Sequence, residues 1–248
     1  SKFYLSLEDD LMRIFGSDRV KAMVEKMGLA EDEAIEANML TKAIENAQKN
    51  LESRNFDSRK HVLQYDEVMN EQRKIIYRQR QMVLDGEDIH DTIMNMMEST
   101  VNSAIDDYIG ISDIPEEWNI RALTEFANST LRANGEFKIT DDEMETITKT
   151  DVYDSLMEIG KKRMSEQAEI FGENMPELER VIMLRVVDNL WMDHLDEMEH
   201  VKREIGLRAF GQHDPVVEYR NVGSELYNGM LESIKRLNIF SLLCRKLK

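Results

Sequence analysis

Residues 38–84 read NMLTKAIENAQKNLESRNFDSRKHVLQYDEVMNEQRKIIYRQRQMVL, a stretch that contains neither proline nor glycine. Apolar residues recur along it at steps of three and four, as they do on one face of an α-helix. Because an α-helix rises 1.5 Å per residue, a helix over this whole stretch would be about 70 Å long. The pattern therefore predicts one long helix against which other elements pack. Its apolar stripe consists of Leu40, Ile44, Ala47, Leu51, Val62, Met69, Ile76 and Val83.

The middle of this predicted helix, residues 52–60, is polar and of mixed charge. A coiled coil needs an unbroken apolar seam, and Asn55 and Ser58 interrupt it here. The segment is either a solvated helix face or a face for a partner domain. Its polar side chains include Arg54, Asn55, Asp57 and Arg59.

The composition of the 248-residue chain indicates an all-α protein, because prolines and glycines are few and strand-type alternation is almost absent. A net charge of −17 argues against nucleic acid as the main partner, since phosphate binding needs a basic surface. The single cysteine, Cys244, permits no disulfide within the chain and suits a reducing compartment. No apolar run approaches the roughly 18 residues that span a bilayer.

The charge is unevenly distributed along the sequence. Residues 201–248 carry nine Lys/Arg and five Asp/Glu, whereas the rest of the chain is strongly acidic. We interpret this basic end as a surface for an acidic partner or an anionic membrane, with chance clustering as the alternative.

The remaining segments predict shorter helices. Residues 89–108 form an amphipathic pattern, and the segment 116–171 has the short helices of an inserted subdomain, with Asp151 capping its longest helix. Residues 177–205 and 215–243 predict two helices of an antiparallel hairpin. The stripe of the first comprises Val181, Leu184, Val187, Trp191, Leu195, Met198 and Ile205, and that of the second Val222, Leu226, Met230, Ile234, Leu237 and Phe240.

The beginning of the sequence predicts a fragment. Residues 3–7 alternate between apolar and polar as in a strand, and residues 20–27 have the pattern of a short helix. A lone strand is unstable, so we expect the rest of its sheet to lie upstream of this chain.

Few residues suggest catalysis. Gly160-Lys161 lacks both the preceding glycine and the following Ser/Thr of a phosphate-binding loop. Two Glu-x-x-His motifs would suit a di-metal helical bundle, although so short a motif also arises by chance in a Glu-rich chain. These motifs are Glu87/His90 and Glu197/His200.

Two further residues are singled out by their position. His194 lies close to the apolar stripe of its helix, so we expect a packed, hydrogen-bonded histidine rather than a metal ligand. Phe210 lies between two small residues in the hairpin loop, where the helices cannot easily cover it. It either folds back onto the hairpin or is an exposed ring that grips an apolar or extended polypeptide partner.

Three long segments resemble the C-terminal half of the SecA family of ATP-driven protein-export motors. They are SKFYLSLEDDLMRIFGSDR at 1–19, ESRNFDSRKHVLQYDEVMNEQR at 52–73 and LRVVDNLWMDHLDEMEHVKREIGLRAFGQHDPVVEYR at 184–220. The resemblance runs over essentially the whole chain and is loosest at 112–175.

The resemblance implies an all-α fold with a long scaffold helix, a packed helical hairpin called the two-helix finger, and an inserted small helical wing subdomain. Residues 1–19 would end the second nucleotide-binding motor domain. Residues 20–111 and 176–248 would form the scaffold domain, and residues 112–175 the wing.

The same resemblance implies a non-catalytic portion of a larger ATPase. It would couple ATP hydrolysis to the movement of preproteins through the SecY channel and restrain the ATPase. ATP and Mg would bind to motor domains outside this chain, which itself would hold no cofactor or metal. A structural helical adaptor or coiled-coil protein is the first alternative, and a di-metal helical-bundle enzyme the second.

The implied partners are the motor domains, the SecYEG channel, an unfolded preprotein and an anionic membrane surface, and a homodimer stays open. The implied location is the cytoplasm, peripheral at the inner face of the cell membrane. The family's finger tip commonly carries a tyrosine, and Phe210 occupies that position, with Arg208 and Gln212 beside it. The polar residues Arg54, Asn55, Asp57 and Arg59 would face the motor domains.

Overall fold

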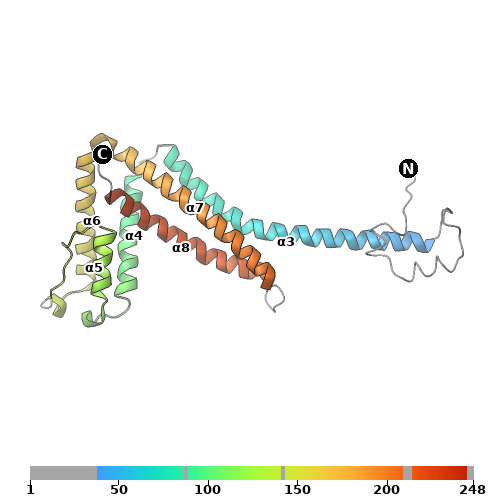
Figure 1. The fold of residues 1–248 in the computed structure, drawn as a ribbon, viewed down its shortest axis with the longest axis horizontal. Coiled ribbons are helices and arrows are strands. Elements are labelled where there is room, and N and C mark those ends of the chain that lie inside the picture. Colours follow the sequence, from blue (N-terminus) through green and yellow to red (C-terminus); the bar gives the residue numbers. More distant parts are fainter. Residues whose placement is uncertain (1–37, 87–88, 141–142, 209–213, 245–248) are drawn as a thin grey trace. The chain divides into compact units, whose positions relative to one another are not determined.

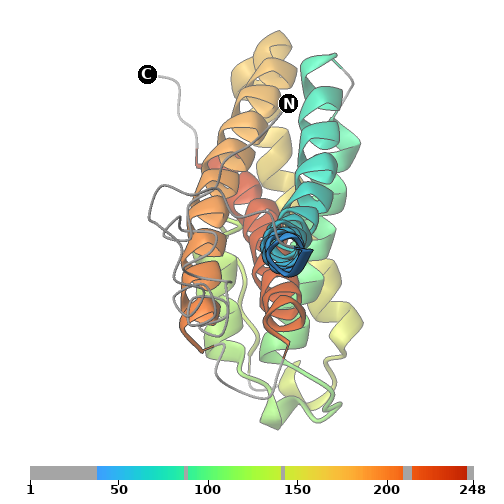
Figure 2. The ribbon, with the colours of Figure 1, turned by 90° about the vertical axis from the view of Figure 1, so that its right-hand side faces the viewer.

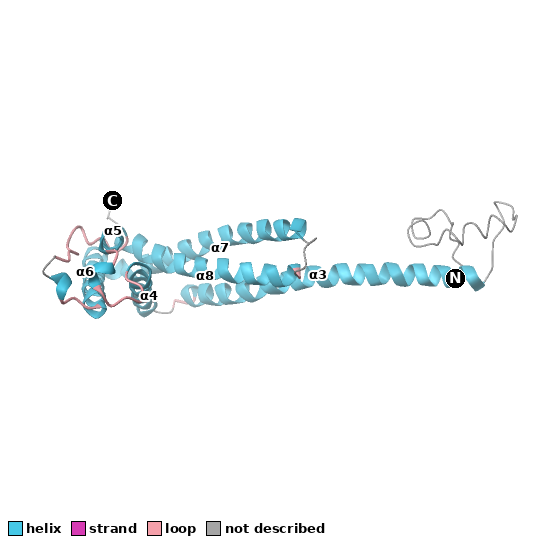
Figure 3. Cartoon of the chain, turned by 90° about the horizontal axis from the view of Figure 1, so that it is seen from below, coloured by secondary structure: helices cyan, strands magenta, loops and turns pink. Residues whose placement is uncertain are grey.

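The computed structural model describes residues 38–86, 89–140, 143–208 and 214–244. It divides into two compact units, Ser1–Glu67 and Val68–Lys248. Within the described residues the chain consists of helices and loops, without a strand (Figure 3). The strand and short helix expected before residue 38 lie outside the described residues.

The long helix predicted from the sequence is confirmed as α3, Asn38–Leu84. In the first unit, every side chain from Leu51 to Leu63 is exposed, so Leu51 and Val62 of the predicted stripe are not buried. In the second unit, the stripe residues Ile76 and Val83 are buried. The helix therefore has a packed C-terminal part and an exposed middle.

The second unit begins with the last part of α3 and continues through α4, His90–Tyr108, and α5, Ile120–Ser129. The predicted face of α4 is confirmed, because Ile93, Met97 and Val101 have no exposed surface. Helix α6, Lys149–Phe171, packs against α4. Short 3₁₀ helices at Pro115–Glu117, Glu143–Glu145 and Gly172–Asn174 connect these elements, and Figure 1 shows α4, α5 and α6 side by side.

The start of α6 differs from the prediction by three residues. Thr148, not Asp151, is the N-cap, and its side chain accepts a hydrogen bond from the Asp151 N–H. Asp151 in turn accepts from the Thr148 N–H at 2.8 Å, which completes a capping box. Two orphan N–H groups are thus satisfied reciprocally, and the helix begins earlier than an Asp cap would allow.

The predicted hairpin is confirmed as α7, Met175–Arg208, and α8, Pro215–Leu243. The two helices pack along each other, as Figures 1 and 2 show. The predicted stripes were partly wrong, since Val181, Leu237 and Phe240 are exposed. Met230 and Ile234 of the predicted α8 stripe are buried, as predicted. The other buried residues of α8 are Val216, Tyr219, Gly223, Tyr227, Asn238, Ile239, Leu242 and Leu243. No described helix of this unit is both long and apolar enough to cross a membrane, and the same holds for the described part of α3.

We predict opposite effects for two helical glycines. A Cβ at Gly160 would lie 2.5 Å from Sδ of the buried Met97, whereas a Cβ at Gly229 would meet nothing within 4 Å. Gly160→Leu should therefore lower the free energy of unfolding by about 1–3 kcal/mol through overpacking. Gly229→Ala should raise it by roughly 0.5–1 kcal/mol through helix propensity. Urea unfolding followed by circular dichroism measures both, and equal stability of the two variants would contradict the α4–α6 packing.

Candidate functional site

A buried polar junction joins the last part of α3 to both helices of the hairpin. Gln72 of α3 is 8% exposed, and its Nε2 donates a hydrogen bond of 3.1 Å to the Gly223 carbonyl of α8. Its Oε1 lies 2.8 Å from Nε2 of His194 on α7. One side chain thus bridges two helices that are separated from it by more than a hundred residues in the sequence. Gln72, His194 and Gly223 are called the clasp below.

The hydrogen bonds of the clasp define the tautomer of His194. Because Nε2 of Gln72 donates to Gly223, its Oε1 faces His194 and must accept. The Nε2 of His194 therefore carries the proton, and its Nδ1 is an acceptor that has no hydrogen-bond partner among the described residues. The prediction of a packed, hydrogen-bonded histidine is confirmed.

Burial keeps His194 neutral. The side chain is 2% exposed, and desolvation lowers its pKa below the ordinary value of 6.5. The rings of Trp191 and Tyr227 lie close by, with centroids 5.6 and 5.8 Å from that of His194. A protonated, positively charged His194 would have no counter-ion among these neighbours. The junction therefore favours the neutral state of His194.

The clasp also depends on the absence of a side chain at Gly223. A Cβ there would lie 2.7 Å from Cε of Met198 and 3.7 Å from Cγ1 of Val68. Glycine lets the α8 backbone approach α3 and α7 closely enough for its carbonyl to meet Gln72. Hydrogen bonds as well as apolar contacts therefore hold the three helices, and the hydrogen bonds fix their register.

An ion pair and a hydrogen bond hold the N-terminal half of α7. Arg80 of α3 donates from Nε to Asp188 Oδ1 of α7 at 2.9 Å, and this contact raises the pKa of Arg80. Nδ1 of His90, at the start of α4, lies 2.9 Å from Oε1 of Glu179, whose side chain is 2% exposed. These contacts tie α7 to α3 and to α4.

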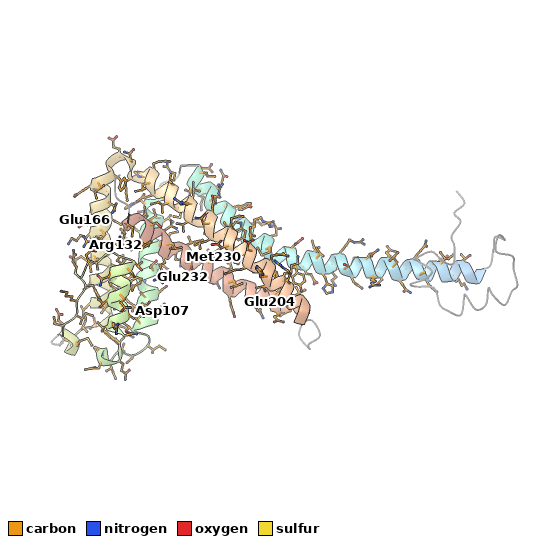
Figure 4. All side chains as sticks on the ribbon, in the orientation of Figure 1. Asp107, Arg132, Glu166, Glu204, Met230 and Glu232 are labelled. Carbon is orange, nitrogen blue, oxygen red and sulfur yellow. The ribbon has the colours of Figure 1, made fainter. Side chains whose placement is uncertain are left out.

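The structure describes some of the functional residues predicted from the sequence but not all of them. Arg54, Asn55, Asp57 and Arg59 are all exposed on α3 in the first unit. Phe210 and Gln212 lie outside the described residues, and so does the side chain of Arg208, the last residue of α7. Glu204, which is labelled in Figure 4, lies near this end of α7.

The described residues of the two Glu-x-x-His motifs form no metal-binding cluster. Glu87 lies outside the described residues, and His90 contacts Glu179 instead of a second motif. Glu197 and His200 are exposed on α7. Among the described residues no group of three His, Cys, Asp or Glu side chains is arranged to hold a metal ion.

The comparisons with known proteins agree with the predicted family. The family model described as the SecA Wing and Scaffold domain matches residues 34–246, and the SecA P-loop domain matches residues 1–32. The chain therefore belongs to the SecA family. Residue 19 as the end of the motor domain stays a prediction.

Several relatives share almost half of their residues with this chain. The chain is 46% identical over 236 residues to protein translocase subunit SecA 1 of Alkaliphilus metalliredigens. It is 47% identical over 236 residues to protein translocase subunit SecA of Clostridium acetobutylicum, and 49% over 239 residues to that of Clostridium kluyveri. Each alignment covers 95% of this chain but only 26–28% of the relative. The chain thus corresponds to about a quarter of these relatives.

We predict that the clasp contributes to stability through Gln72. Gln72→Met keeps the side-chain volume but leaves the His194 N–H buried without an acceptor, while the Gly223 carbonyl keeps its helical partner. The free energy of unfolding should fall by about 1–3 kcal/mol, the cost of one unsatisfied buried polar group. Gln79→Met, on the exposed side of the same helix, is the matched control and should change little. A Gln72→Met protein as stable as its control would argue against the clasp.

We predict a pH dependence carried by His194. Burial lowers the pKa of His194 in the folded state, so the unfolded chain takes up the proton at a higher pH than the folded chain does. The stability that the neutral His194 contributes is therefore lost as the pH falls below about 6.5. The loss is at most about 1.4 kcal/mol for each pH unit down to the folded-state pKa. In His194→Gln, an amide replaces the ring without titrating. The stability advantage of the natural protein over His194→Gln should shrink between pH 7.5 and 5.5, and a constant difference would contradict the assignment.

Proposed function

We propose that this chain is the scaffold and wing portion of a longer, ATP-driven protein translocase and performs no catalysis itself. The match of residues 34–246 to the SecA wing and scaffold supports the assignment, as do relatives named as protein translocase subunits. In this proposal ATP and Mg bind to the rest of the longer protein. The carrying observation is the clasp, which fixes one end of α3 to the hairpin.

The proposed role is mechanical coupling. Helix α3 is continuous from the exposed segment around Arg54 and Arg59 to Gln72, where the clasp holds α7 and α8. In the proposal Arg54, Asn55, Asp57 and Arg59 contact the motor domains. A rigid element that is fixed at one end transmits a displacement applied at the other. Movement caused by ATP hydrolysis would thus reach the hairpin, and the hairpin would in turn restrain the ATPase.

The proposed working end is the loop between α7 and α8. Phe210, with Arg208 and Gln212, would contact an unfolded preprotein at the cytoplasmic mouth of the SecYEG channel. An aromatic ring grips polypeptide side chains of any sequence through apolar contact. The excess of basic residues from 201 to 248 would favour an anionic membrane surface, so the longer protein would be peripheral at the inner face of the membrane.

A titration separates this proposal from a structural adaptor. ATP hydrolysis by the separately purified motor portion is measured while this chain is added. Saturable binding with a lowered rate supports a scaffold that restrains the ATPase. A well-folded chain that does not bind the motor would leave the adaptor as the better assignment. The di-metal enzyme gains no support from the described residues, and stoichiometric iron or manganese that is lost in His90→Ala and His200→Ala would revive it.

We predict that the side chain at position 210 acts on transport and not on nucleotide binding. In the longer protein, Phe210→Gly should reduce preprotein transport into channel-containing vesicles at least about tenfold, since a lost apolar grip of 1.4 kcal/mol already has that effect. Phe210→Tyr keeps the ring and is the control that should retain transport. ATP affinity should be unchanged in both variants. Equal loss of ATP affinity and transport, or normal transport in Phe210→Gly, would refute the tip assignment.

A further inference from the structure

The wing contains a segment without regular secondary structure whose side chains alternate between exposed and buried. Glu136, Lys138 and Thr140 are exposed, Phe137 is 3% exposed, and Ile139 packs partly buried against the core. A period of two is the pattern of an extended chain that covers a core with one face. Residues 136–140, between α5 and α6, are called the wing edge.

The backbone of the wing edge has unused hydrogen-bonding groups. At its ends, the Glu136 N–H bonds to the Ala133 carbonyl at 2.9 Å, and the Thr140 N–H to Oε2 of Glu143 at 2.8 Å. Between them, the N–H and C=O groups of Phe137, Lys138 and Ile139 make no hydrogen bond within the part of the chain that the structure describes. In an extended chain the N–H and C=O groups of successive residues point to opposite sides, so those of the exposed Lys138 are open on one side and those of Phe137 and Ile139 on the other. Another extended backbone can pair along one of these sides.

A groove lies beside this backbone. Its volume is about 300 Å³, and it lies between the wing edge and the first turns of α6. Phe137, Ile139, Ile147, Val152 and Ile159 line its apolar part. Ser155 lies on the same lining and is exposed. A groove of this size accommodates one or two apolar side chains of a bound segment, as strand-addition sites do.

The rim of the groove is acidic. Glu136, Glu143 and Asp151 line it, against Lys138 as the one basic lining residue. Hydrogen bonds from Thr140 lower the pKa of Glu143, and those from Thr148 lower the pKa of Asp151, so both carboxylates are ionised at neutral pH. Glu136 is already paired with Lys162 and Arg163, which leaves Glu143 and Asp151 to attract a basic partner.

We propose that the wing edge binds an extended segment of another polypeptide by backbone pairing, in which apolar residues alternate with Lys or Arg. The open N–H and C=O groups require an extended backbone, the groove takes the apolar side chains, and the acidic rim takes the basic ones. A second copy of this chain is a poorer partner, because it would bring Glu143 and Asp151 against the same two carboxylates. The proposal does not depend on the translocase function.

A peptide-binding experiment on the 248-residue chain tests the proposal. The probe is a fluorescent nine-residue peptide in which lysine and valine alternate, and fluorescence anisotropy measures its dissociation constant. We expect saturable binding, weakened at least about tenfold, or 1.4 kcal/mol, when every lysine is replaced by glutamate. N-methylation at every residue removes the peptide's backbone donors and should weaken binding by at least a similar factor. Equal affinity of the N-methylated peptide would overturn backbone pairing.

A pair of variants locates the binding. Ser155→Trp fills the groove from its exposed lining without removing a core residue, and should abolish binding. Ser165→Trp makes the same replacement at an exposed position of α6 outside the groove and should bind normally. Circular dichroism verifies that both are folded. Loss of binding in both variants or in neither, or no binding by the natural chain, would overturn the proposal whatever the outcome of the ATPase titration.

Discussion

The arrangement of the second unit depends on one glutamine. The side-chain amide of Gln72 bonds to two other helices: its N–H donates to α8 and its oxygen accepts from α7. Burial raises the cost of misplacing it, because a shift of one helical turn would leave the His194 N–H and the amide unpaired in a dry environment. Apolar side chains alone tolerate such a shift much better, since hydrophobic contact has no direction. The polar junction therefore sets the register of α3 against the hairpin.

The neutral state of His194 is part of the same constraint. A charged imidazolium would donate from both ring nitrogens, and Nδ1 has no acceptor among its described neighbours. The rings of Trp191 and Tyr227 lie against it and provide no carboxylate. The junction therefore permits one arrangement of the three helices and penalises neighbouring arrangements. Gly223 makes the arrangement sterically accessible.

The sequence predicts the helices better than their contacts. The end of α3 and both bounds of the return helix α8 follow from glycine, proline and apolar spacing, and these were predicted to the residue. The faces were less certain, because Leu237 and Phe240 look like core residues but are exposed, while Gly223 and Tyr227 are buried. A helix that packs against two others buries more than one stripe of residues. The spacing of apolar residues along that helix alone does not show which stripes are buried. Gln72 has no local signal, since its partners lie 122 and 151 residues away.

The exposed middle of α3 carries apolar side chains among its charged ones. Phe56 and Leu63 are 57% and 68% exposed on the same turns that carry Arg54 and Arg59. Exposed apolar residues interspersed with charges are typical of an interface with another domain, whereas a solvated helix face would have no need of them. The chain spans about a quarter of its relatives, so the remaining part of such a protein is large enough to supply that domain. This combination favours a partner-facing segment over a solvated face for Arg54, Asn55, Asp57 and Arg59.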